Sequence, residues 1–112
     1  MPFINTKTNV EISKDAEVKI KSRLGKAVST LGKSEGYLMV NFEDRQRLYF
    51  GGDASPAAFV EVRLFGKASR SAYAKMTEAV TAIVSEEAKV PADRIYVQYE
   101  EVPNWGLGGS NF

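Results

Sequence analysis

Pro2 is the residue whose type and position most directly indicate chemistry. Met1 is readily removed when a small residue such as proline follows it, and its removal would leave a prolyl secondary amine at the N-terminus. An ordinary α-amino group has a pKa of about 7.7–8.0, and an apolar pocket beside the ammonium group of Lys33 would lower the pKa of such an amine. Pro2 would then be a general base near neutral pH. Taken alone, a proline at the second position is common and indicates no activity.

The other side chains that could take part in chemistry are Lys33, which follows a predicted helix end, and the tyrosines Tyr37, Tyr96 and Tyr99 of predicted strands. The chain has no histidine and no cysteine, which excludes imidazole bases, thiol nucleophiles, disulfides and zinc–thiolate sites. We therefore expect no metal and no cofactor. Each candidate also has a structural interpretation: Lys33 could stabilise a helix dipole, and Tyr37 and Tyr96 could be ordinary packing residues.

Length and composition indicate one folded domain spanning residues 1–112. The chain is 44% hydrophobic and 26% charged with a formal net charge of +1, which is typical of a globular protein and not of a disordered one. Nucleic-acid binding is not expected, because the basic residues are interspersed with acidic ones. A membrane span is not expected either, since no stretch approaches the roughly 20 apolar residues that one needs. The N-terminus does not resemble a secretory signal, so a cytoplasmic protein is the default expectation.

The elements that must position these residues can be read from the pattern. The first half predicts a strand over residues 2–7, a helix that begins at the N-cap Ser13 and ends at Gly32, and a strand over residues 37–43. A brief strand over residues 48–50 is also predicted. The second half predicts a strand over residues 58–65, a helix after Ser69 with apolar positions up to Val84, and a strand over residues 95–100.

The second half repeats the order of the first. Phe3-Ile4 matches Phe59-Val60, helix matches helix, and residues 37–40 match residues 95–98. Two strand–helix–strand units with right-handed crossovers predict an α/β fold: a four-stranded mixed sheet with two helices on one face. The other face of such a sheet would be bare, and covering it with further subunits favours an oligomer. The glycine-rich tail is expected to form a strand added to a neighbouring subunit.

Six stretches of the chain resemble corresponding stretches of the macrophage migration inhibitory factor family, in the same order from end to end. They are the start Met-Pro-Phe-Ile-Asn-Thr, Leu31-Gly-Lys33 with Tyr37, Phe50-Gly-Gly with Pro56, Phe65-Gly-Lys, Pro91-Ala-Asp-Arg-Ile-Tyr96-Val, and the tail Trp105-Gly-Leu-Gly-Gly-Ser-Asn-Phe112. Each is weak as a motif, but six in register are hard to produce by chance.

The resemblance implies a homotrimer with an active site at each subunit interface, and a tautomerase that interconverts keto and enol forms of phenylpyruvate-like acids. Pro2 would move the proton at carbon. Lys33 and the backbone N–H of Phe65 would hold the substrate's carboxylate or carbonyl oxygen. Tyr96 and Gln98 of the neighbouring subunit would contact its oxygen end. The resemblance places five further residues in the pocket: Phe3, Tyr37, Trp105, Leu107 and Phe112.

The chain departs from the family's pattern in this pocket. Gln98 stands where the family usually has asparagine, Leu107 stands where it has an aromatic residue, and an aromatic residue appears earlier as Trp105. These changes leave the proton-moving base in place and bear on substrate choice. The Cys-x-x-Cys of the animal cytokine is also absent, so a redox role has no basis here.

Two other functions remain open at the level of sequence. The protein could be a cytokine mimic, secreted without a signal peptide, that binds a host cell-surface receptor and has only vestigial catalysis. It could also hydrate or dehalogenate unsaturated acids, a chemistry that requires additional arginine and glutamate side chains near Pro2. Arg63 is the one residue that the sequence nominates for that role.

Overall fold

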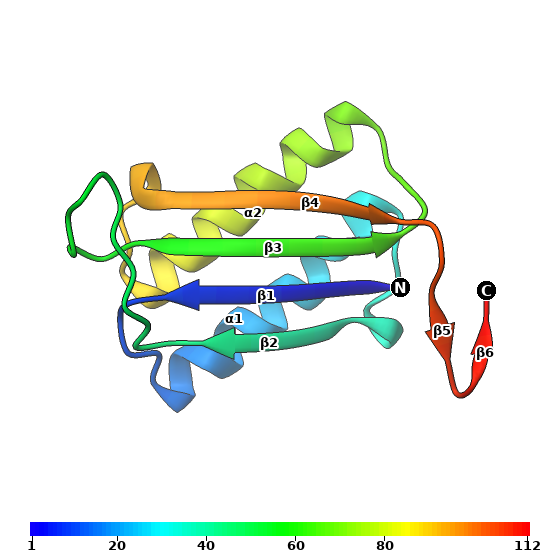
Figure 1. The fold of residues 1–112 in the computed structure, drawn as a ribbon, viewed down its shortest axis with the longest axis horizontal. Helices are drawn as coiled ribbons and strands as arrows, with labels where there is room; N and C mark the ends of the chain where they lie inside the picture. Colours follow the sequence, from blue (N-terminus) through cyan, green and yellow to red (C-terminus); the bar gives the residue numbers. More distant parts are fainter.

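A four-stranded sheet with both long helices on one face makes up most of the chain in the computed structural model, which describes all of residues 1–112 (Figure 1). The strands are β1 (Pro2–Thr8), β2 (Met39–Glu43), β3 (Ala58–Phe65) and β4 (Ile95–Val102). Their order is β2-β1-β3-β4, with β1 parallel to β2, β3 parallel to β4, and the central pair antiparallel. Each parallel pair is joined through one helix, so the predicted α/β fold of two strand–helix–strand units is confirmed.

The two helices begin where the sequence predicts them, after Ser13 and after Ser69. α1 (Lys14–Ala27) begins after Ser13, whose hydroxyl accepts the N–H of Ala16, and α2 (Arg70–Ala88) begins after Ser69 in the same way. α1 continues as the 3-10 turn η1 (Val28–Leu31) and stops at Gly32, which has a φ of 71°. Glycine adopts this left-handed conformation without a steric penalty. No helix of the structure has both the length and the hydropathy of a membrane span.

Alternation along the strands separates two sides of the sheet. On β3, Ala58, Val60 and Val62 are buried against the helices, while Phe59, Glu61 and Arg63 point to the other face. The helices contribute most of the same hydrophobic core through the buried residues Ile20, Leu24, Val28, Leu31, Met76, Val80, Ile83, Val84 and Ala88. No element of this chain covers the opposite face of the sheet, as Figure 1 shows.

Of the predicted strands, one begins two residues later than expected and one is absent. Tyr37 lies in a 3-10 turn, η2 (Glu35–Tyr37), and β2 begins only at Met39, because the Ser34 hydroxyl caps this turn by accepting the N–H of Gly36 at 3.1 Å. Residues 48–50 form no strand; one isolated bridge joins Phe50 to Asp53. The carbonyl oxygen of Leu48 instead accepts a hydrogen bond from the side chain of Asn9. Sequence alternation alone does not supply the neighbouring strand that such a segment needs.

The remaining elements are short. The 3-10 turn η3 (Ala92–Arg94) leads into β4, and the tail folds back on itself as the hairpin of β5 (Gly106–Leu107) and β6 (Ser110–Asn111). Gly108 and Gly109 form its turn with φ values of 62° and 93°. Two consecutive positive φ angles are those of a type I′ turn, for which glycine pairs are favoured. The hairpin stands beside the end of the sheet at which the N-terminus lies (Figure 1).

Candidate functional site

Pro2 lies in the wall of the largest cavity of the chain. As the first residue of β1 it is buried, and it lines a cavity of about 630 Å³ together with four other residues that the sequence nominated: Phe3, Tyr37, Trp105 and Leu107. Small-molecule sites have volumes of roughly 300–1,000 Å³ and a mostly apolar lining with a few polar groups. This cavity has both the volume and the lining of such a site. The structure thus brings residues from the two ends of the chain and from η2 to a single concave surface.

The β5–β6 hairpin closes one side of the cavity. It holds Trp105 and Leu107 against the cavity, and the backbone N–H of Phe112 donates to the carbonyl oxygen of Trp105 at 3.0 Å. The ring of Phe112 packs against that of Phe65 with 5.9 Å between centroids. Phe112 is thus held beside the cavity without lining it. In the single chain, Leu107 and Phe112 stay largely exposed.

Lys33 and Phe65 lie just outside the cavity and are held together. The Lys33 ammonium group donates to the carbonyl oxygen of Phe65 at 2.9 Å, which places the charge at the end of β3. The backbone N–H of Phe65 donates to the carbonyl oxygen of Met1 at 3.0 Å. The N–H that the sequence analysis assigned to substrate is therefore occupied by an acceptor from the chain itself, and that acceptor belongs to the residue preceding Pro2.

The N-terminal amino group has an altered acidity. Burial, together with the positive charge of Lys33, lowers the pKa of the Met1 amino group below its ordinary value of 8.0. Both causes disfavour the protonated form, because a charged group loses solvation on burial and a like charge repels it. An amine in this place is therefore a stronger candidate for a general base than an exposed terminus.

Tyr96 and Gln98 are not near Pro2 within one chain. β1 starts at the end of the sheet where β4 finishes, and Tyr96 is the second residue of β4, so it lies at the opposite end from Pro2 (Figure 1). There its ring packs against that of Phe50 at 5.1 Å and lines a separate apolar hollow of about 200 Å³. Gln98 pairs with Glu61 in the middle of the uncovered face.

The cavity also contains charged residues that sequence reasoning largely missed. Arg63 and Glu100 line it, and the Nε of Arg63 lies 2.9 Å from Oε2 of Glu100. The sequence nominates Arg63 only for a different reaction, and no pattern in it points to Glu100. The alternation of β3 and β4 places each on the uncovered face, but the register that sets them opposite one another becomes visible only in the folded sheet. Met1, Met39 and Val102 also contribute to the apolar lining.

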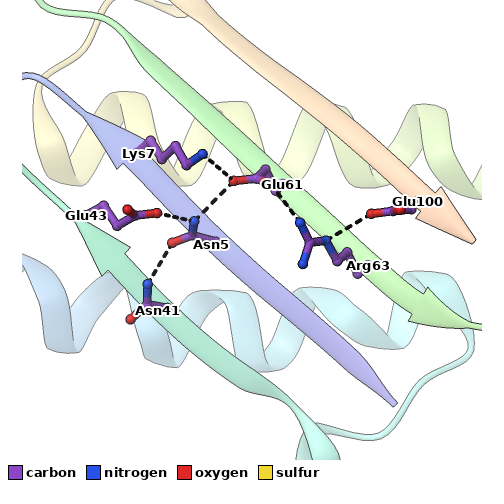
Figure 2. A network of polar contacts seen from close by, with 7 residues as sticks. All are labelled: Asn5, Lys7, Asn41, Glu43, Glu61, Arg63 and Glu100. Carbon is purple, nitrogen blue, oxygen red and sulfur yellow. Dashed lines mark hydrogen bonds and ion pairs between the residues drawn. The ribbon is translucent and has the colours of Figure 1, made fainter. Parts of the chain in front are cut away.

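Arg63 and Glu100 form one end of a polar network across the uncovered face (Figure 2). From β3, Glu61 binds Lys7 at 3.1 Å, Asn5 at 3.1 Å and Arg63 at 3.2 Å. Asn5 in turn donates to Glu43 and accepts from Asn41, both of β2. The network connects all four strands, so its geometry depends on the register of the whole sheet.

Comparisons with known proteins agree with this arrangement. The family model described as "Macrophage migration inhibitory factor (MIF)" matches residues 1–112. A macrophage migration inhibitory factor homolog of Trichuris trichiura is 28% identical over the full length of both chains, and the macrophage migration inhibitory factor of Xenopus laevis is 24% identical over 100% of this chain and 99% of its own.

Solved structures are also similar along the whole chain. The structure of Leishmania major MIF2 is 33% identical with a TM-score of 0.95, covering 100% of this chain and 97% of that one. The structure of the macrophage migration inhibitory factor homologue of Prochlorococcus marinus is 32% identical with a TM-score of 0.90 and 98% coverage of each chain. At these identities over nearly the full length of both chains, the two structures indicate a shared family as well as a shared fold.

Proposed function

The chain belongs to the macrophage migration inhibitory factor family, and from this premise we propose that it is a cofactor-independent tautomerase of phenylpyruvate-like α-keto acids. Pro2, freed by removal of Met1, is the general base. Its secondary amine takes a proton from the carbon next to the keto group, and the keto oxygen receives a proton from water as the enol forms. The protonated amine then gives its proton to water, which regenerates the base. The buried position of Pro2 in an apolar cavity supports this role, because it favours the neutral, basic form of the amine.

The observation that carries the proposal is the hydrogen bond from the Phe65 N–H to the Met1 carbonyl oxygen. Cleavage of the bond between Met1 and Pro2 removes this acceptor, so one event both exposes the amine and frees a backbone donor beside it. The Met1 oxygen stands in for a substrate oxygen at 3.0 Å from that N–H. A fixed donor near a developing negative charge stabilises the enolate-like transition state.

Lys33 supplies the positive charge for the substrate's carboxylate. Its ammonium group is already directed to the carbonyl oxygen of Phe65 at 2.9 Å, next to the donor that Met1 releases. A carboxylate bound there forms charge-assisted hydrogen bonds and fixes the orientation of the acid relative to Pro2. The side chains of Phe3, Tyr37 and Trp105 supply the wall against which the rest of the substrate packs.

The complete site is proposed to form in a homotrimer. Within one chain Tyr96 and Gln98 lie away from Pro2, and one face of the sheet has no cover. A neighbouring subunit placed against that face brings its Tyr96 and Gln98 to the cavity, where they contact the oxygen end of the substrate. Gln98 is one methylene longer than the asparagine usual in the family, and its amide is expected to reach further into the cavity.

Receptor binding as a cytokine mimic is the alternative function, and family membership is its basis. No cluster of residues in the structure points to a particular receptor, whereas the cavity, the buried Pro2 and the freed N–H all favour catalysis. A Pro2 variant separates the two, because loss of the base abolishes tautomerisation and leaves a binding surface unchanged.

The test is keto–enol exchange of phenylpyruvate on protein whose intact mass is measured in the same preparation. Protein without Met1 is expected to exceed the buffer rate by orders of magnitude, and Pro2→Gly is expected to lower kcat/KM roughly 10²–10⁴-fold, the usual contribution of a general base. Pro91→Gly changes an exposed proline away from the cavity and serves as the matched control. An inert wild-type protein that lacks Met1 would show the proposal to be wrong.

A further inference from the structure

The guanidinium group of Arg63 is fixed at the wall of the cavity. It lies over the ring of Phe3, 5.9 Å from the centroid, in the geometry of a cation–π contact. Its Nη2 donates to Glu61 at 3.2 Å and its Nε lies 2.9 Å from Glu100. An arginine has five N–H donors, and Nη1 donates to no atom of the protein. Arg63 therefore has free donors in a position that is already set.

Arg63 is the side-chain cation that lines the cavity, whereas Lys33 does not line it and donates to the carbonyl oxygen of Phe65. Arg63 lies two residues before Phe65 on β3, and the Lys33 ammonium group lies at the carbonyl oxygen of Phe65. The two positive charges therefore offer two separate anchoring points. One carboxylate bound at Lys33 leaves Arg63 without a substrate partner. The cavity of about 630 Å³ has room for a second acidic group that reaches Arg63.

The two glutamates that hold Arg63 are held very differently. The Glu61 side chain is only 14% exposed and is bound by Lys7 and Asn5 as well as by Arg63. The Glu100 side chain is 60% exposed and contacts only Arg63. In the single chain this is an exposed ion pair, which contributes little stability, so Glu100 can leave Arg63 at small cost, whereas Glu61 keeps the guanidinium in place. Glu100 is therefore an exchangeable occupant of an anion site.

We propose that Arg63 forms a second anion subsite in the cavity, and that the protein prefers α-keto acids that carry a second carboxylate. The distal carboxylate displaces Glu100 and binds the free face of the guanidinium, while the keto acid group binds at Lys33 and the Phe65 N–H. Arginine suits this role because its planar fork pairs with both oxygens of a carboxylate. The inference rests on the proposed tautomerase function.

The experiment compares phenylpyruvate with para-carboxyphenylpyruvate, which differ by one carboxylate, by following exchange of the protons next to the keto group in D2O. Arg63→Gln is expected to lower the kcat/KM ratio of diacid to monoacid by roughly 10-fold or more, the cost of losing a hydrogen-bonded charge partner. Glu100→Gln is expected to raise that ratio, because a neutral amide competes less for Arg63. Arg70→Gln and Glu101→Gln are the matched controls outside the cavity.

Binding is measured independently of turnover through the single tryptophan, Trp105, which lines the cavity. Quenching of its fluorescence by phenylpropionate and by para-carboxyphenylpropionate gives the two dissociation constants for each variant. Arg63→Lys retains the charge and is the variant to use where Arg63→Gln does not fold. A tighter diacid complex that depends on Arg63 in an inactive protein would support the subsite and refute the tautomerase.

Arg63→Gln and Glu100→Gln are expected to change the diacid-to-monoacid ratio of kcat/KM in opposite directions, so either variant can contradict the subsite. If Arg63→Gln lowers kcat/KM equally for both substrates, Arg63 only holds the sheet together and the subsite does not exist. A fall in the diacid preference of Glu100→Gln would likewise contradict displacement of Glu100. If phenylpyruvate exchange depends on Pro2 but the diacid ratio is unaffected by either variant, the tautomerase stands and the subsite is refuted.

Discussion

Lys33 has two separable effects at the scale of single residues, because it bears both on the terminal amine and on the end of β3. Its charge, second to burial, lowers the pKa of the Met1 amino group, and its ammonium group lies 2.9 Å from the Phe65 carbonyl oxygen. The Pro2 amine is one residue further along the same segment and is expected to experience both influences. Basicity and substrate binding are therefore linked through one side chain.

Replacing Lys33 is expected to change the pH dependence as well as the rate. The base works when deprotonated, so kcat/KM rises with pH through the pKa of the Pro2 amine. Lys33→Gln removes a charge that lowers this pKa, so the pKa rises and the acidic limb of the profile moves to higher pH. The lost carboxylate contact also raises KM, roughly 10-fold. Lys67→Gln, an exposed lysine two positions beyond Phe65, is the control and is expected to leave the profile in place.

An unshifted acidic limb in Lys33→Gln would show that Lys33 does not influence the base. Measuring kcat/KM of both variants and of the wild type at constant ionic strength over the same pH range distinguishes these outcomes, because salt screens charge interactions near the surface.

At the scale of elements, the segment between β2 and β3 is held without being a strand. The Asn9 side chain donates to the carbonyl oxygens of Leu48, Ala54 and Ser55 and accepts the N–H of Ala57 at 2.9 Å. Arg94 donates to the carbonyl oxygens of Asp53 and Pro56 and to that of Ser55 as well, and it lies over the ring of Phe50 at 5.1 Å. These contacts place Phe50 against Tyr96, the residue that the trimer is proposed to present to a neighbouring cavity.

Asn9→Ala is expected to loosen this segment. It removes four hydrogen bonds, some of them exposed to solvent, and should lower the free energy of unfolding by about 2 kcal/mol. Urea denaturation measures the change, and Asn104→Ala, at an exposed asparagine beyond β4, is the control. Equal stability of the two variants would show that Asn9 does not hold the segment.

At the scale of the whole molecule, the uncovered face of the sheet combines an apolar rim with a polar centre. Phe59, Tyr96 and Met39 lie on this face, which also carries the polar network of Figure 2. The outer edges of β2 and β4 are also unpaired in one chain. An uncovered apolar face and open strand edges favour association, which is the physical basis of the proposed homotrimer.

Phe59→Arg is expected to convert the trimer to monomers, because it places a charge in the apolar part of this face next to Tyr96. Light scattering during size-exclusion chromatography measures the mass, and circular dichroism checks that each chain stays folded. Tautomerase activity is expected to fall with the trimer, since Tyr96 and Gln98 then no longer reach a neighbouring cavity. Val18→Arg, on the exposed side of α1, should remain trimeric and active.

A Phe59→Arg protein that is monomeric and fully active would show that one chain carries the whole site. A trimer that survives the substitution would instead indicate that the subunits associate through another surface.

The sequence by itself determined the types and order of the main elements, because these depend on local patterns. Helical spacing of apolar residues, the N-cap Ser13, the glycine after Leu31 and the repeat of the two halves were enough for the strand–helix–strand units. It also nominated Pro2 and four other residues that line the cavity. Tyr37 was assigned to the following strand because it directly precedes the apolar residues of that strand. In the structure it ends a 3-10 turn that Ser34 caps.

Only the tertiary structure decided which residues distant in sequence meet. The pairing of Arg63 with Glu100 depends on the parallel register of β3 and β4, which the packing of α2 and the sheet sets. The Met1 carbonyl reaches the Phe65 N–H because β1 and β3 run antiparallel in one particular register, and Tyr96 lies far from Pro2 because β4 begins where β1 ends. Register is a property of long-range packing, and no local pattern of residues contains it.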